Sequence, residues 1–362
     1  MRFGANSILR EQATSAAEAG IDYTVWKLNS TAGSFTPPLT DTAVGTTGTF
    51  IVTITSKTSS LKTVTATGYI PNSTKPRAKR TIKVDVAVSN TSISFHYAVQ
   101  TNEGGVSMSN SATINGTVYS NGSITGSQSS RINGDAYAVG SISSPDPTVP
   151  APYHKYPFSS PQPFPTLNYQ TWRDEAANGG TIDCSLTPAE CDISGGTANI
   201  GPKKYIGNLS ITNQAVVTVK GSVWVTGNVT VRNGNTQINL DPTFGSNGTI
   251  WIVDGTVSVD QGAAFNPTSA NPKGYILVAT TSPSSSAMSI GQSGANAVFY
   301  ALEGGAQLSQ TAKVNSLTAK QLTMTQQSVL NYDTGLASAI FTAGPGGSWQ
   351  IKRGTYKFTS SP

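Results

Sequence analysis

The stretch that decides the fold reads YIGNLSITNQAVVTVKGSVWVTGNVTVRNG from Tyr205 to Gly234 and, after a short break, GTIWIVDGTVSVDQG from Gly248 to Gly262. Apolar and polar residues alternate in it, and a period of two is the pattern of a strand with one buried face. The runs last only three to five residues, and most of them end at a glycine, which tolerates a positive φ at a corner.

Strands this short, turned this often, favour a mainly β fold built as a right-handed, single-stranded β-helix. In such a solenoid each coil lies on the coil before it and points Val or Ile inward. The alternative is a β-sandwich, which usually has longer strands and turn signals about every 8 to 12 residues. The unit I-N-G recurs at Ile114 and Ile132, which indicates one coil per 18 residues.

The chain divides into five predicted segments, taken in order. Residues 1–29 form a helix, because apolar residues recur at spacings of three and four from Leu9 to Leu28. Residues 30–103 form an antiparallel β-meander of four runs, and residues 104–144 form the first β-helix coils. Residues 145–197 are a Pro-rich insertion between coils, with a brief helix over 168–178 and a cysteine loop. Residues 198–362 form the main β-helix.

Composition argues against several classes of protein. Charged residues are only 11% of the 362 residues, which is low for a globular enzyme. The densest basic cluster, Lys75, Arg77, Lys79 and Arg80, is more typical of a solvated hairpin end than of a nucleic-acid site, so no nucleic-acid partner is expected.

Two cysteines, Cys184 and Cys191, lie close together, and no other Cys or His is near them in sequence. Zinc would need four ligands. A disulfide that closes a small loop fits better and implies an oxidising, extracytoplasmic setting, with two free thiols as the alternative.

Two stretches resemble known families. AAEAGIDYTVWKLN, at Ala16–Asn29, is similar to the helix of PilX-type and related type IV pilin-like proteins, and TVTATGYI with RTIKVDV is similar to the sheet that follows it. The repeats INGTVYSNGSITG resemble polymer-forming, bactofilin-like β-helices. The resemblance implies a structural or adhesive subunit of a type IV pilus-like filament, at the cell surface or outside the cell. The leader, processing site and apolar stalk of such pilins are not in this sequence, so we expect them upstream of it.

Enzyme chemistry is not visible in the sequence, and no cofactor or metal is expected. A glycosidase needs two carboxylates, yet the acids of the predicted solenoid are scattered singly. The two histidines, His96 and His154, lie outside it, and His96 is interpreted as a strand residue. The alternative function is a secreted β-helix that binds or cleaves polysaccharide.

Four aromatic residues are candidates for a sugar-stacking or subunit-packing surface. They are Tyr119, Tyr137, Trp224 and Trp251, which alternate with Val or Ile and are therefore predicted to point outward. Partial burial under the Pro-rich insertion is the competing interpretation.

A smooth face of small residues marks the N-terminal helix. Ala13, Ala16, Ala17 and Gly20 lie at spacings that place them together, and small residues permit close packing between helices. The first half of the helix is therefore predicted to project and to pack against other pilin-like subunits or copies of the chain in a filament. The second half, with Val25 and Leu28, is predicted to lie on the meander.

Overall fold

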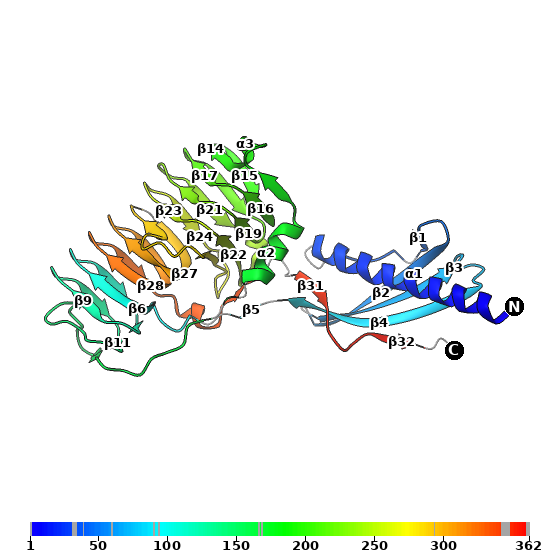
Figure 1. The fold of residues 1–362 in the computed structure, drawn as a ribbon, viewed down its shortest axis with the longest axis horizontal. Helices are drawn as coiled ribbons and strands as arrows, with labels where there is room; N and C mark the ends of the chain where they lie inside the picture. Colours follow the sequence, from blue (N-terminus) through cyan, green and yellow to red (C-terminus); the bar gives the residue numbers. More distant parts are fainter. Residues whose placement is uncertain are drawn as a thin grey trace. The chain divides into compact units, whose positions relative to one another are not determined.

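The computed structural model describes residues 2–30, 35–38, 40–58, 61–89, 91–92, 95–165, 167, 169–292, 294–341 and 348–359. The chain forms two compact units (Figure 1). Unit 1 contains residues 1–90 and 346–362, and unit 2 contains residues 91–345. The fold is mainly β, with a long N-terminal helix, an antiparallel meander and a long parallel sheet.

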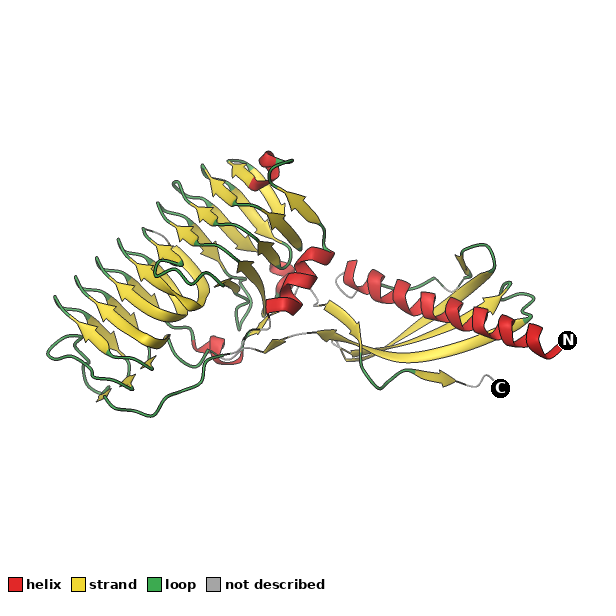
Figure 2. Cartoon of the chain, viewed as in Figure 1, coloured by secondary structure: helices red, strands yellow, loops and turns green. Residues whose placement is uncertain are grey.

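Unit 1 packs helix α1 (Arg2–Ser30) on one face of an antiparallel sheet (Figure 2). The first four strands are β1 (Thr42–Val44), β2 (Gly48–Thr58), β3 (Leu61–Ile70) and β4 (Ala78–Ser89), and each pairs with the next. Alternate residues of β4, namely Ile82, Val84 and Val86, are buried together with Ile21 and Leu28 of the helix. The predicted helix and meander are therefore present.

The end of the chain completes this sheet. Strands β31 (Ser348–Ile351) and β32 (Lys357–Thr359) both pair antiparallel with β4. The assignment of all of residues 198–362 to the main β-helix is therefore wrong for the last residues. Because β4 and β31 are neighbours in one sheet, unit 2 is an insertion between them.

Unit 2 is built on a parallel sheet, and from β13 to β24 each strand pairs with the strand three places further along the chain. Thus β16 pairs with β19, β17 with β20 and β18 with β21. The strands form three rows, A, B and C, which the chain visits in turn. The described pairings from β6 to β29 are parallel, unlike those of an antiparallel sandwich.

The rows have the following members. Row A contains β13 (Thr181–Asp183), β16 (Lys203–Ile206), β19 (Val223–Val225), β22 (Asn247–Val253), β25 (Ile276–Thr280), β8 (Val118–Ser120), β11 (Ala136–Ala138) and β12 (Lys155–Tyr156). Row B contains β14 (Asp192–Ser194), β17 (Leu209–Thr212), β20 (Val229–Val231), β23 (Val257–Val259), β26 (Met288–Ile290) and β9 (Ile124–Gly126). Row C contains β15 (Thr197–Ile200), β18 (Val216–Val219), β21 (Gln237–Leu240), β24 (Ala264–Asn266), β29 (Val329–Asn331), β7 (Thr113–Asn115) and β10 (Arg131–Asn133).

Three longer strands turn corners and serve more than one row: β6 (Val99–Met108), β27 (Gly294–Leu308) and β28 (Lys313–Met324). Two short strands, β5 (Thr91–Ser92) and β30 (Ile340–Phe341), pair antiparallel where the chain enters and leaves unit 2.

The order of the strands in space differs from their order in sequence. Strand β6 pairs with β28, and β7 pairs with β29, so the first strands of unit 2 stack on its last ones. Two of the segment boundaries predicted from the sequence are therefore wrong. Residues 99–103 belong to β6 and not to the meander, and His96 lies before β6 outside any strand. The fourth meander run, residues 93–100, is therefore wrong for its described part, and its first two residues lie outside the described residues. Strands β13, β14 and β15 lie in the parallel sheet, although the sequence assigns most of them to the insertion.

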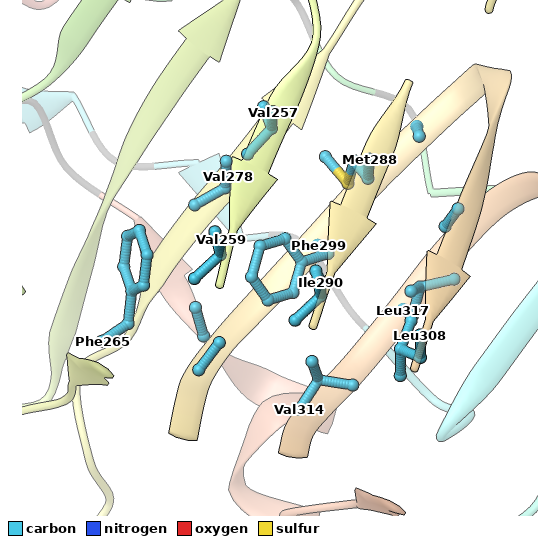
Figure 3. Packing of buried hydrophobic residues seen from close by; sticks show 14 of the residues in the cluster. Val257, Val259, Phe265, Val278, Met288, Ile290, Phe299, Leu308, Val314 and Leu317 are labelled. Carbon is cyan, nitrogen blue, oxygen red and sulfur yellow. The ribbon is translucent and has the colours of Figure 1, made fainter. Parts of the chain in front are cut away.

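The core of unit 2 consists of inward residues from all three rows. Val225 of row A, Val231 of row B and Val219 of row C belong to one buried cluster. Figure 3 shows how Val257, Val259, Met288 and Phe299 pack within it. The predicted inward register of the valines in β18, β19 and β20 is therefore correct.

The repeated unit at Ile114 and Ile132 spans three strands, one from each row. The two isoleucines are partners in adjacent strands and are both buried. Outside them, Asn133 Nδ2 donates to Asn115 Oδ1 at 2.7 Å, and Asn115 Nδ2 donates to Asn331 Oδ1 at 2.7 Å. The repeat therefore combines an apolar column inside with an amide ladder outside, which links successive circuits.

A second apolar cluster covers the outside of row A. Ile250 and Ile252 of β22 point away from the core but are buried by Trp172 of α2 (Tyr169–Asn178) and by Leu336 of the 3₁₀ helix η2 (Thr334–Ser338). The two remaining short helices are α3 (Pro188–Cys191) and η1 (Pro242–Phe244). Strand β22 is therefore apolar on both faces, as in sheets covered on both sides.

Val225→Asp is expected to lower the free energy of unfolding of unit 2 by about 3–5 kcal/mol, because it places an unpaired charge in the core. The matched control is Thr226→Asp. The Thr226 hydroxyl accepts a hydrogen bond from the Gly207 N–H at 3.0 Å, and a carboxylate can accept the same bond. Denaturant unfolding of the two variants checks this, and equal stabilities would mean that the inward register is incorrect.

Candidate functional site

One outward column on row A collects most of the predicted aromatic residues. Its members are register partners in successive strands, in the order Lys204, Trp224, Ile252, Ala279, Tyr300, Thr318, Gln100, Tyr119, Tyr137 and Tyr156. Three of the four candidates, Tyr119, Tyr137 and Trp224, therefore lie on a single line along the sheet.

A Pro-rich strap, residues 157–165, is bound to the middle of this column by its backbone. Tyr119 donates to the Ser160 carbonyl, Gln100 donates to the Pro163 carbonyl at 2.8 Å, and Tyr300 donates to the Pro165 carbonyl at 2.5 Å. Beside the column, Asn121 donates to the Gln162 carbonyl at 3.0 Å and accepts from the Gln162 N–H at 3.1 Å. Proline removes backbone donors, so an extended Pro-rich segment mainly offers carbonyls, and these side chains satisfy them.

Burial raises the pKa of two tyrosine hydroxyls on this side of unit 2. It raises the pKa of Tyr300 well above its usual value, and it raises the pKa of Tyr169, at the start of α2, to about 12, with the carboxylate of Glu303 adding to the effect. Both hydroxyls, like an ordinary phenol, are protonated hydrogen-bond donors at neutral pH.

The ring faces of the tyrosines are used within the molecule. Tyr119 and Tyr137 stack with centroids 5.6 Å apart, and Tyr137 and Tyr156 stack at 4.6 Å, both nearly parallel. Tyr119 is only 4% exposed. A sugar ring stacks on an aromatic face, so Tyr119 and Tyr137 offer it mainly ring edges and hydroxyls.

The Trp224 ring makes cation–π contacts with two basic side chains. The Lys204 ammonium lies 3.9 Å from the ring centroid and the Arg173 guanidinium 5.6 Å from it. The indole N–H donates to Asp254 at 2.8 Å, and Asp254 also pairs with Arg173. The arrangement fixes α2 to row A through cation–π and ion-pair contacts.

The prediction for Trp251 is wrong. Trp251 is a register partner of Val223 and lies fully in the core, while its neighbours Ile250 and Ile252 point outward. The alternation could not reveal this, because α2 and η2 cover the outside of β22 and make both of its faces apolar.

A groove of about 520 Å³ remains beside the tyrosines. It is lined by His96, Tyr97, Thr117, Tyr119, Asp135, Tyr137, Ser159, Ser160 and Gln162. Burial, together with the nearby Asp135 carboxylate, raises the pKa of Tyr137. His96 is exposed at this groove, but no second acid completes a catalytic pair among the described lining residues.

The predicted disulfide between Cys184 and Cys191 is present, with the Cα atoms 5.5 Å apart. Cys184 follows β13 and Cys191 ends α3, so the bond closes the loop between β13 and β14. It therefore holds the terminal layer of the parallel sheet, β13 to β15, in which β13 and β14 pair only with β16 and β17 among the described strands.

The small-residue face of α1 is buried inside unit 1. Ala13, Ala16, Ala17 and Gly20 are covered by β2 and β3. A Cβ atom at Gly68 of β3 would lie 2.1 Å from the Ala13 carbonyl oxygen and 2.6 Å from the Ala17 nitrogen, so the helix backbone almost touches the strand. The prediction that these four residues pack against other subunits is therefore wrong, because the chain's own sheet uses the face.

In the described part of the chain, no three His, Cys, Asp or Glu side chains cluster in a way that would hold a metal ion. No described helix is both long and apolar enough to cross a lipid bilayer.

Comparison with known proteins gives little. No protein-family model matches the sequence, and no curated protein matches it. Among solved structures, the chain is similar to the crystal structure of the competence-associated pilin ComZ from Thermus thermophilus, with 12% identity and a TM-score of 0.31 over 97% of this chain and 98% of that one. A TM-score of this size does not establish a shared fold.

Ala17→Glu is expected to destabilise unit 1 by about 3 kcal/mol or more, because a charged side chain would enter the contact between α1 and β3. Ser15→Glu, on the exposed side of the same helix, is the control and is expected to change stability by about 0.5 kcal/mol or less. Thermal unfolding measured by circular dichroism checks both, and an unaffected Ala17→Glu variant would contradict the burial of this face.

Labelling of the unfolded, non-reduced protein with a thiol reagent is expected to find no free thiol, because Cys184 and Cys191 are joined. Replacing both cysteines with serine is expected to cost about 2–3 kcal/mol, as for a short closed loop. Two labelled thiols per chain would argue against the bond and against an oxidising location.

Proposed function

We propose that the chain is a structural or adhesive protein of the cell surface, a pilin-like subunit that assembles through its N-terminal helix and displays the inserted unit 2. The observation that carries the proposal is the division of α1 into an exposed part and an embedded part. From Asn6 to Gln12 no residue is buried, and Ile8 is 58% exposed, whereas Ala13 is the first of a continuous buried stripe.

An exposed, helical N-terminus that is rigidly continuous with an embedded helix suits repeated contacts between subunits. Equivalent contacts repeated head to tail give an open filament rather than a closed dimer. We therefore propose the first turns of α1, and not its small-residue face, as the assembly surface. Its partners are copies of this chain or related pilin-like subunits.

The displayed unit is, in this proposal, a right-handed single-stranded β-helix. Support comes from the passage of the chain through rows A, B and C in turn and from the single cluster that their inward residues form. Parallel strands joined by a crossover are right-handed in nearly all known cases.

The proposed location is outside the cytoplasm, on the cell surface or in a pilus. The disulfide supports this location, since such bonds persist mainly in oxidising compartments. We also propose a non-enzymatic role. The ring faces of Tyr119, Tyr137 and Trp224 are already used inside the molecule, which gives no support to the alternative of a sugar-stacking surface.

The test replaces Ile8 with Glu and follows the chain into surface filaments in the cells that produce it. Ile8→Glu is expected to leave the circular dichroism spectrum and melting temperature unchanged, because the side chain is exposed, and to reduce incorporation about tenfold or more, as expected when a charge enters an apolar contact. Ser15→Glu is the control for added charge on α1 and is expected to be incorporated normally. Normal incorporation of Ile8→Glu would refute assembly through these first turns.

A further inference from the structure

The two units differ strongly in charge. Unit 1 has 13 Lys and Arg against 5 Asp and Glu, a net charge of +8, whereas unit 2 has 10 against 13, a net charge of −3. The overall value of +5 conceals this difference. A concentrated positive charge on a small unit attracts anionic partners.

Part of this charge lies on the face of the unit 1 sheet opposite α1. In β4, Ile82 and Val84 point to the helix, so Lys83 points to the other face. Across the sheet its register partners are Thr65 of β3 and Lys357 of β32, and Thr53 of β2 is the next one beyond Thr65. Two hydroxyl groups and two ammonium groups therefore follow one another across this face.

Lys83 and Lys357 are directly opposite each other in register and both are exposed. Like charges at opposed positions in antiparallel strands are destabilising. Among the described residues neither has an ion-pair partner. A local arrangement that costs stability is typical of functional sites.

The nearest carboxylate cannot neutralise this pair, because it is already bound. Asp85 accepts from the Lys57 ammonium at 2.8 and 3.0 Å and from the Thr63 hydroxyl at 2.6 Å. The bond from Lys57, followed by that from Thr63, holds the pKa of Asp85 below its usual value, so it stays ionised and paired.

These groups surround a formed pocket. A cavity of about 270 Å³ is lined by Lys57, Lys83, Asp85, Gly354, Thr355 and Lys357. Its rim is fixed by the backbone of Asp85, whose N–H donates to the Thr355 hydroxyl at 3.0 Å and whose carbonyl accepts from the Lys352 N–H at 2.8 Å. The lysines therefore line a pocket that the loop between β31 and β32 helps to form.

We propose that this pocket binds the oxyanion groups of an acidic polysaccharide. The Lys83 and Lys357 ammonium groups would pair with a sulfate or carboxylate, and the threonine hydroxyls of β2 and β3 would hydrogen-bond to sugar hydroxyls. A nucleic acid is disfavoured, because single strands are held by stacking on exposed aromatic rings. On this face Tyr69 of β3 is half-buried. The exposed rings of Tyr356 and Phe358 flank Lys357 but belong to the face of α1, where Phe358 pairs with Ile82 and Tyr356 donates to Glu18. The proposal goes beyond filament assembly and does not depend on it.

The experiment titrates the full chain with heparin, a sulfated polysaccharide, at low ionic strength, and repeats the titration at increasing salt. The test variant is Lys83→Gln with Lys357→Gln. The control variant is Lys75→Gln with Arg77→Gln, which removes the same charge from the exposed β3–β4 turn of the same unit. Titration with polygalacturonate distinguishes carboxylate from sulfate as the bound group.

The wild type is expected to bind, and the pocket variant to lose about tenfold or more in affinity, with a salt dependence reduced by about two released ions. The control variant is expected to change affinity by about twofold or less. In the absence of ligand, the pocket variant should melt no lower than the wild type, because the like-charge pair is removed, while the heparin-induced rise in melting temperature should disappear.

Equal losses in the two double variants would overturn the proposal, because binding would then follow net charge alone. Tighter binding of a DNA duplex than of either polysaccharide would overturn the class of ligand. An absence of binding by the wild type at low salt would overturn the site itself.

Discussion

The parallel pairing between β28 and β6 joins two parts of unit 2 that are far apart in sequence, and the layers formed by residues 99–156 depend on it. Leu317 pairs with Val99 and Leu322 with Val106, and all four side chains enter the common core. The Leu317 N–H donates to the Ala98 carbonyl at 3.0 Å. Without this junction the layers from residue 99 to 156 would have an open apolar end, and the strap that crosses row A would lose Gln100 and Tyr119 as partners.

Local sequence patterns predicted the strands that have one buried face and one solvent-exposed face. The register of Val225 and its neighbours and the pairing of Cys184 with Cys191 followed from period and spacing, and the repeated isoleucines Ile114 and Ile132 are partners in adjacent parallel strands. Trp251 could not be predicted, because α2 and η2 cover the outer face of its strand and remove the polar signal. The insertion between β4 and β31 could not be predicted either, since strand pairing over this separation leaves no local pattern in the sequence.

Residues that resemble a binding surface in the sequence can instead make contacts within the same chain. A run of small residues permits any close approach, and in α1 the partner is Gly68 of the same chain, so Ala13 and Ala17 serve an internal contact. The aromatic column is similar, because Tyr119 holds the strap and Trp224 holds α2. The lysines on the opposite sheet face gave no sequence signal, since Lys83 and Lys357 meet only when β32 returns to β4.

The insertion of unit 2 also sets the order in which the chain can fold during synthesis. Domains usually fold from the N-terminus as they emerge from the ribosome, but β4 receives β31 and β32 only after the whole of unit 2 has been made. Until then the outer edge of β4 is a long, unpaired strand edge, which in a nascent chain invites pairing with another chain. Lys79, Arg80 and Lys83 lie on that strand, and lysine on an exposed edge is a known means of discouraging such pairing. Basic side chains on this strand therefore suit an edge that stays unpaired until the C-terminus has been made.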